Sequence, residues 1–106
     1  MNAKIEINDD LLTVYLSGEI DHHSAKLIRE EVDFQITSSK PQIVSLDFKD
    51  VSFMDSSGIG LIMGRYRLVS GYGGKITISN VSAYLRRVMR LAGIDSIVEI
   101  KNEKEN

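Results

Sequence analysis

The chain has 106 residues, of which 26% are charged and 42% hydrophobic, a balance typical of one soluble globular domain spanning residues 1–106. Its formal net charge of −2 excludes a protein that binds nucleic acid mainly through a basic excess. The absence of cysteine excludes disulfides, thiolate nucleophiles and cysteine-ligated metals. No segment has the apolar length of a signal peptide or a membrane span, so we expect a cytoplasmic protein.

The N-terminal segment predicts a β-hairpin. Residues 4–8 and 12–16 each alternate apolar and polar side chains, as strands with one buried face do. Asp9 and Asp10 lie between the two segments and supply a short acidic turn. We therefore expect two neighbouring strands in one sheet.

The period then changes to that of a helix. Ser24 is the predicted N-cap, since its hydroxyl can accept a hydrogen bond from a backbone N–H of the first turn. Four apolar side chains beyond it share one helical face: Ala25, Ile28, Val32 and Ile36. Pro41 lies beyond this helix and breaks it.

The middle of the chain predicts a strand and a second helix. Residues 43–48 form the strand, and Lys49-Asp50 predicts a turn before the short apolar segment 51–54. The helix that follows ends at the glycine-rich segment 71–74, whose residues tolerate a positive φ. Its predicted core stripe consists of Ile59, Ile62, Met63, Tyr66 and Val69.

The last third of the chain predicts two strands around a third helix. Residues 75–79 alternate, residues 96–100 predict the final strand, and the polar tail 101–106 is expected to fray. Gly93 is the predicted C-cap of a helix whose apolar stripe consists of Leu85, Val88, Met89 and Ala92. The order ββαβαβαβ predicts an α/β domain, a mixed sheet of about five strands with helices packed on it.

The segment Asp55-Ser56-Ser57-Gly58 carries the strongest functional signal. It lies where a strand ends and a helix begins, which is where α/β folds commonly place their sites. Asp and Ser are also ordinary N-cap residues, so a purely structural role is an equal alternative. Gly58 and Gly60 leave the two hydroxyls uncrowded, which predicts that a protein kinase can reach them.

A small serine hydrolase is the alternative from a different class. The hydrolase elbow needs a glycine two residues before the nucleophile, where this chain has Met54 and Asp55 before its two serines. Only His22 or His23 could act as the base, and no other residue is arranged to orient it. We therefore expect that the protein is not an enzyme.

No cofactor and no metal site is predicted. Glu19, Asp21, His22 and His23 form an acidic and imidazole cluster, but the chain has no recurrent ligand set elsewhere. A solvated loop whose carboxylates favour a helix N-terminus is one interpretation. A contact surface for a basic group of a partner, through Asp21 in particular, is the other.

Two leucines of the second helix fall outside its predicted core stripe. At about 100° per residue, Leu61 and Leu68 lie on the opposite side, on the flank of Ser57 and Gly64. Two interpretations stay open. The leucines pack against neighbouring helices, or they form an exposed apolar strip on which a partner docks.

Two motifs resemble the anti-sigma factor antagonist family, the bacterial STAS domains. They are Gly18-Glu-Ile-Asp-His-His-Ser-Ala25 and Val51-Ser-Phe-Met-Asp-Ser-Ser-Gly-Ile-Gly-Leu61, with Gly64-Arg-Tyr66 after the second. The resemblance covers nearly the whole chain. The two histidines favour the sporulation branch, which acts on the sigma F system. The general stress-response branch shares the Asp-Ser core and is the alternative.

The resemblance implies a switch that acts by binding. In the family, the unphosphorylated antagonist binds an anti-sigma factor that is also a serine kinase, and so frees the sigma factor. The kinase phosphorylates the serine directly after the motif's aspartate, here Ser56, and a phosphatase reverses the reaction. Asp21 matches a family position that contacts an arginine of the anti-sigma factor. The family's C-terminal helix is expected to be missing or truncated here.

The resemblance also implies a set of partner-binding residues, with no direct contact to nucleic acid or membrane. Asp55 is expected to cap the helix or position the acceptor, and Asp21 to anchor the edge of the interface. A phosphate on Ser56 adds about −1.5 to −2 charges and so roughly doubles the net charge. The predicted docking surface is formed or flanked by Ser57, Gly58, Leu61, Gly64 and Leu68.

Overall fold

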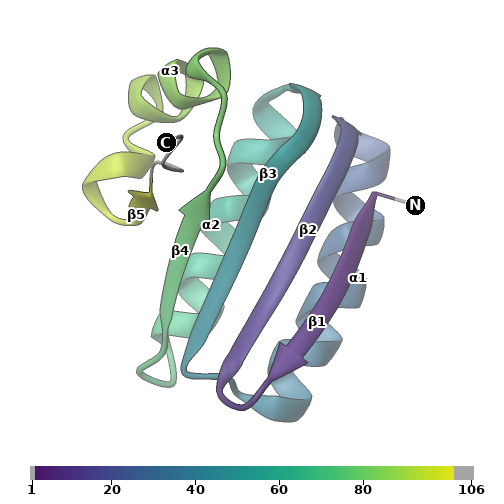
Figure 1. Cartoon of the computed structure of the whole chain (residues 1–106), viewed down its shortest axis with the longest axis vertical. Coiled ribbons are helices and arrows are strands. Elements are labelled where there is room, and N and C mark those ends of the chain that lie inside the picture. Colours follow the sequence, from purple (N-terminus) through teal and green to yellow (C-terminus); the bar gives the residue numbers. More distant parts are fainter. Residues whose placement is uncertain (1, 102–106) are drawn as a thin grey trace, which may run out of the picture.

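The computed structural model describes residues 2–101, which form one five-stranded sheet with helices packed on it (Figure 1). The strand order is β1-β2-β3-β4-β5, with β1 antiparallel to β2 and every other neighbouring pair parallel. This confirms the predicted mixed sheet and the order ββαβαβαβ. In chain order the elements are β1 (Ala3–Asn8), β2 (Leu11–Ile20), α1 (His22–Ser39), β3 (Ile43–Met54), α2 (Ser56–Ser70), β4 (Lys75–Ser79), α3 (Ala83–Leu91), the 3₁₀ turn η1 (Ile94–Ser96) and β5 (Glu99–Lys101).

The core lies between the sheet and the two longer helices. In Figure 1, α1 and α2 lie behind the strands and cover one face of the sheet. Alternate side chains of the central strands turn toward them, and the stripe predicted for α1 is buried as expected. Each large aliphatic side chain buried in this way contributes about 1.5–3 kcal/mol. Members from β2 and α1 are Leu12, Val14, Leu16, Ala25, Ile28, Val32 and Ile36.

β3 is one continuous strand, so the turn predicted at Lys49-Asp50 is wrong. Along its pairing with β2, the register shifts by one residue at two points, and each time β3 carries the extra residue. Such bulges bend a strand and raise its twist without ending it. The second bulge falls between Val51 and Phe53 and leaves the Phe53 side chain exposed. The turn-like residues therefore mark a bend within the strand.

The N-cap of α1 is Asp21, and the prediction of Ser24 is wrong. The Asp21 carboxylate accepts a hydrogen bond from the Ser24 amide (2.9 Å), and the Ser24 hydroxyl accepts one from the Asp21 amide (3.0 Å). Ser24 is thus the third helical residue of a reciprocal capping box. Both residues are good caps, and the helix starts at the earlier one because the later one can bond back to it.

The segment after α3 also differs from the prediction. The predicted strand over residues 96–100 is reduced to β5, and η1 precedes it. Ile94 is fully buried and holds this turn against the core. The C-cap of α3 is Ala92, one residue before the predicted Gly93, and Gly93 follows it with a left-handed φ of 81°. Ala92, which the sequence places in the core stripe of α3, is exposed.

The end of the described chain lies in the sheet. Lys101, predicted to start the frayed tail, pairs with Ser79 of β4. Residues 102–106 lie outside the described residues, and so does the expected loss of the family's C-terminal helix. Across residues 2–101, no helix combines the length and the apolar composition needed to cross a membrane.

Candidate functional site

The carboxyl ends of β2 and β3 bring the two sequence motifs together. Ile20 and Met54, the last residues of these strands, are partners in the parallel ladder. Asp21 and Asp55 follow them directly and cap α1 and α2. The Asp55 amide donates a hydrogen bond to the Ile20 carbonyl oxygen (3.2 Å). Both helices therefore begin at the same edge of the sheet, the upper edge in Figure 1.

Asp21 is held in place by the first turn of α1. The hydrogen bond from the Ser24 amide, followed by that with the Ser24 side chain, holds the pKa of Asp21 below its ordinary value. The Ser24 hydroxyl also lies 2.9 Å from the Glu19 carbonyl oxygen, to which it donates, so the loop before the helix is tied to the cap. Asp21 is half-buried. It therefore presents a positioned negative charge at this edge.

Ser56 is the first residue of α2, and its side chain is exposed. Within residues 2–101 its hydroxyl has no hydrogen-bond partner, whereas the amide of its neighbour Ser57 donates to the Asp55 carboxylate (2.8 Å). A phosphate on Ser56 would lie at a helix N-terminus, where backbone N–H groups and the helix dipole favour an anion. The adjacent Asp55 carboxylate would oppose it by like-charge repulsion.

The two predicted glycines of the site have different roles. A Cβ added at Gly58 would come within 2.1 Å of Met54 Cγ and 2.4 Å of Met54 Sδ, so only glycine lets α2 approach the end of β3. Gly58 is buried and acts in packing. At Gly64 an added Cβ would meet nothing within 4 Å. Gly64 is half-buried, and packing does not require a glycine at this position.

Leu61 and Leu68 do not form an exposed apolar strip. Leu61 is only 6% exposed and belongs to the core, and Leu68 is half-buried against it. The first of the two interpretations is the correct one, because α1 packs beside α2 and covers this flank. The predicted core stripe is correspondingly rotated, since Ile59, Met63 and Tyr66 are only half-buried. The buried residues of α2 are Gly58, Leu61, Ile62, Arg65 and Val69.

The sequence did not predict the ion pair between Asp33 of α1 and Arg65 of α2. Arg65 Nε lies 2.7 Å from Asp33 Oδ1, and Arg65 Nη2 donates to Asp33 Oδ2 (3.2 Å). The closer contact is ionic only, because within residues 2–101 neither Arg65 Nε nor Asp33 Oδ1 makes a hydrogen bond. Arg65 Nη1 also donates to the Leu61 carbonyl oxygen (3.1 Å). Burial lowers the pKa of Arg65, and the charge of Asp33 opposes that shift. The pair fixes the two helices relative to each other beneath the site.

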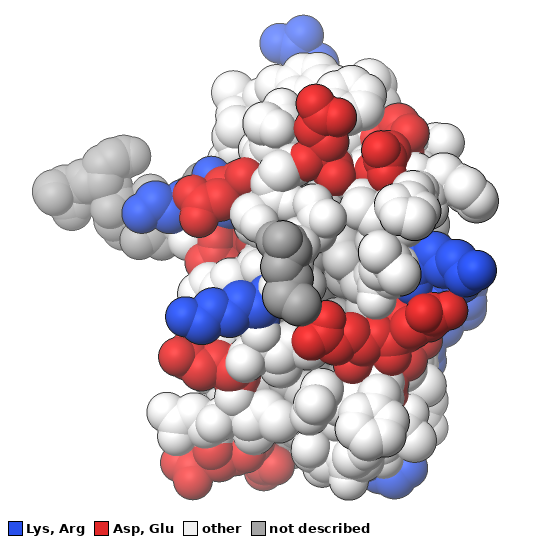
Figure 2. Space-filling model, turned by 90° about the vertical axis from the view of Figure 1, so that its right-hand side faces the viewer, with Lys and Arg blue, Asp and Glu red and all other residues white. Residues whose placement is uncertain are grey.

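Phe53 is a second residue that periodicity alone missed. It pairs with Glu19 at the ends of β3 and β2, and its side chain is 42% exposed. A regular alternation would have placed it on the same face as the buried Val51, but the bulge reverses it. An exposed aromatic ring lies two residues before the Asp55 cap. Acidic side chains also lie on the upper part of the face in Figure 2, the end at which α1 and α2 begin.

The geometry does not support a nucleophile and base pair. His22 and His23 lie in the first turn of α1 with exposed side chains. No hydrogen bond within residues 2–101 joins either of them to Ser56. In the same part of the chain, no three acidic or imidazole side chains gather as a metal site would require. The site offers an accessible hydroxyl, two capping carboxylates and an exposed aromatic ring.

Comparisons with known proteins agree with the motifs. Residues 2–106 match the STAS domain family. The anti-sigma F factor antagonist of Paenibacillus polymyxa is 35% identical over 108 residues, which cover 100% of this chain and 92% of that protein. The anti-sigma-B factor antagonist of Bacillus subtilis (strain 168) is 30% identical, with 99% and 94% covered.

Solved structures show the same relationship. The anti-sigma factor antagonist SpoIIAA in its unphosphorylated form has a TM-score of 0.85 at 29% identity, with 97% of this chain and 89% of that chain covered. The phosphorylated form of the Bacillus cell fate determinant SpoIIAA has a TM-score of 0.78 at 29% identity, with 97% and 92% covered. The chain therefore belongs to the anti-sigma factor antagonist family of STAS domain proteins.

Proposed function

We propose that this protein is a cytoplasmic antagonist that phosphorylation of Ser56 switches off. Unphosphorylated, it binds an anti-sigma factor that is also a serine kinase and so releases the sigma factor. Phosphorylation by that kinase ends the binding, and a serine phosphatase restores it. The observation that carries the proposal is the exposed, unbonded Ser56 hydroxyl at the start of α2, next to the Asp55 cap and at the same edge as Asp21.

Charge at the interface supplies the switching mechanism. A partner surface that packs on a neutral hydroxyl must desolvate about −1.5 to −2 additional charges once Ser56 is modified. The phosphate adds to the negative potential already created by the two caps, so an acidic partner surface is repelled as well. The helix N-terminus tolerates the anion, so the fold persists. The switch therefore requires no backbone rearrangement.

The docking surface consists of residues around Ser56 that remain accessible. Asp21 is the anchor for a basic group of the partner, and Phe53 is the apolar contact, since aromatic residues often dominate binding energies. Ser57 and Gly64 are half-buried on α2 and contribute the part of their surface that stays accessible. Three residues support this surface from below, because they are buried or packed against the core: Gly58, Leu61 and Leu68.

We propose the sigma F system as the target. The relative from Paenibacillus polymyxa supports this choice through its identity over the full chain, and so does the Asp21-His22-His23 motif. The general stress response is the second candidate, because the anti-sigma-B antagonist of Bacillus subtilis is also similar over nearly the full chain. The two candidates share the same switch and differ in the kinase that recognises it.

Phosphorylation assays test both parts of the proposal. The protein is incubated with ATP and an anti-sigma F kinase or, in parallel, an anti-sigma B kinase, and its intact mass is measured. We expect a gain of one phosphate, mapped to Ser56, and faster transfer from the sigma F kinase. Ser56→Ala should abolish the gain, whereas Ser70→Ala at the other end of α2 should leave it unchanged.

Binding assays complete the test. Ser56→Ala should retain affinity for the kinase, and Ser56→Asp should lose most of it. Stoichiometric phosphorylation of Ser56→Ala at Ser57 would show that the acceptor is assigned to the wrong residue. Turnover of an activated ester that Ser56→Ala abolishes would instead favour a hydrolase and contradict the proposed switch.

A further inference from the structure

β1 is an edge strand, and no other strand of residues 2–101 pairs with its outer side. The Asn2 carbonyl oxygen accepts a hydrogen bond from the Ser17 amide of β2 (2.9 Å). In an antiparallel ladder, successive residues alternate between bonding to the partner strand and pointing away from it. Lys4 and Glu6 therefore share the orientation of Asn2 and bond to β2. The backbone groups that point outward are those of Ala3, Ile5 and Ile7.

The sequence of β1 is self-complementary about Ile5. When a second copy of β1 is laid antiparallel with Ile5 opposite Ile5, Lys4 faces Glu6 of the second copy and Ala3 faces its Ile7. In this register the residues with outward backbone groups oppose one another, so they exchange hydrogen bonds along the seam. The two Lys4–Glu6 pairs fall at the positions without hydrogen bonds, where opposing side chains come closest.

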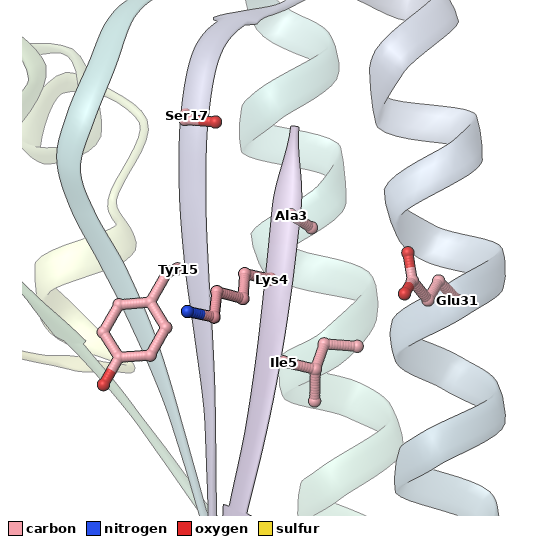
Figure 3. A pocket seen from close by; sticks show the side chains of 6 residues that line it. All are labelled: Ala3, Lys4, Ile5, Tyr15, Ser17 and Glu31. Atoms are coloured by element: carbon pink, nitrogen blue, oxygen red, sulfur yellow. The ribbon is translucent and has the colours of Figure 1, made fainter. Parts of the chain in front are cut away.

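An apolar flank of α1 runs beside the same edge. Glu31 of α1 lines a hollow of about 410 Å³ together with residues of β1 and β2, and Figure 3 shows Ala3 and Ile5 pointing toward α1. Leu27 and Phe34 lie one turn before and one turn after Glu31 on that flank. Their side chains are 53% and 69% exposed. In a two-fold pair the α1 helices lie on the same side of the joined sheet, so these side chains close over the seam.

We propose that two copies of this chain pair through their β1 strands and form one continuous sheet across a two-fold axis at Ile5. Such an interface is isologous, since each copy offers the same strand to the other. A second copy fits this edge better than an unrelated peptide. Among the registers that pair the outward hydrogen-bonding groups, the one with Ile5 opposite Ile5 also sets Lys4 opposite Glu6. Figure 2 shows this side of the molecule, where basic and acidic side chains lie next to one another.

Glu31 opposes the pairing. It lies beside Ile5 in the hollow, so both copies bring a carboxylate to the same side of the seam. The like charges repel, and Glu31→Gln should therefore tighten the dimer. Lys4 and Glu6, on the other face of β1, supply the compensating attraction. The pairing leaves Ser56 outside the interface, because α2 packs on β3 and β4, and β2 lies between these strands and β1.

Sedimentation equilibrium of the full chain over a range of concentrations tests the proposal. We expect a monomer–dimer equilibrium for the unmodified chain. Lys4→Glu places two Glu–Glu pairs across the seam and should raise the dissociation constant about tenfold or more. The double variant Lys4→Glu/Glu6→Lys restores opposite charges and should restore the dimer. Lys75→Glu makes the same charge change at an exposed position of β4 and should have little effect.

Two outcomes would overturn the proposal. One is a monomer at all concentrations up to about 1 mM. The other is a dimer that Lys4→Glu leaves intact, which would place the interface elsewhere or point to a different occupant of the β1 edge. Circular dichroism of each variant confirms that the fold is retained. Ser56→Asp should leave the dimer unchanged, so this test and the kinase-binding test fail independently.

Discussion

The backbone amide of Asp55 donates a hydrogen bond to the carbonyl oxygen of Ile20 (3.2 Å), and this contact joins the starts of two helices. The residue after Ile20 is Asp21, the cap of α1, and Asp55 itself is the cap of α2. The parallel pairing of β2 with β3 therefore converts two motifs more than thirty residues apart into one edge of charged and hydroxyl groups.

Asp55→Ala should destabilise the fold by about 1 kcal/mol, because the Ser57 amide loses its acceptor. Asp55→Asn keeps an acceptor oxygen and should cost much less. Chemical denaturation measures both. Ser82→Ala is the matched control, since it removes the cap of α3 and the acceptor of the Leu85 amide. Ser82→Ala should lower the free energy of unfolding by a similar amount but leave kinase binding unchanged. Asp55→Ala should lower both the stability of the fold and the affinity for the kinase. Equal kinase affinity for the two variants would place Asp55 outside the interface.

Asp21 should make the stability of the protein depend on pH in the acidic range. Its folded pKa lies below the ordinary value of 3.8, because the Ser24 amide and hydroxyl stabilise the carboxylate. The carboxylate therefore contributes stability above its unfolded pKa, and this contribution is lost as the pH falls through the folded pKa.

Comparison with Asp21→Asn isolates this effect, because Asn retains the cap but does not titrate. The difference in the free energy of unfolding between the two proteins should be constant above about pH 5 and shrink toward pH 2. NMR titration of the Asp21 carboxyl gives the folded pKa directly, and Ser24→Ala should raise it. A titration midpoint at or above 3.8 would contradict the role assigned to the capping box.

The glycines of α2 should respond in opposite ways to alanine. Gly58→Ala forces a Cβ against the buried Met54 side chain and should destabilise the fold by about 1–3 kcal/mol. Gly60→Ala meets nothing within 4 Å at an exposed helical position and should stabilise it by roughly 0.5–1 kcal/mol. Thermal and denaturant unfolding compare the two. A Gly58→Ala variant as stable as the unmodified chain would mean that α2 can move away from β3.

Removing Asp33 from the Arg65–Asp33 pair should destabilise the fold more than replacing Arg65. Asp33→Ala leaves a guanidinium whose side chain is only 7% exposed without its counter-charge, which should cost roughly 3 kcal/mol. Arg65→Met replaces the buried group by an apolar one of similar length, and the Asp33 side chain, 34% exposed, can turn to water. Arg65→Met should therefore lower the free energy of unfolding by less than Asp33→Ala does. A double variant should cost less than the sum of the two single variants, and additivity of the two would contradict the coupling.

Local segments of the sequence predicted their own structures well. Residues 75–79 alternate and form β4 with those bounds, and the stripe from Ala25 to Ile36 is the buried face of α1. Both predictions rest on periodicity, which is a property of a segment and its backbone. Where a segment was compatible with two local structures, its sequence did not determine which one forms. Asp21 and Ser24 are both acceptable caps, and Lys49-Asp50 suits a bend within a strand as well as a turn.

The sequence by itself determined the kinds of elements, their order, and the serine at the start of α2. Tertiary structure decided which side of α2 is covered. A stripe centred on Ile59 and Met63 and one that includes Leu61 and Arg65 are similar in periodicity, and the packing of α1 selects the second. The strand register decided that Asp21 and Asp55 share an edge, because pairing between β2 and β3 depends on both strands at once. Burial and register arise from contacts between segments, and no single segment contains that information.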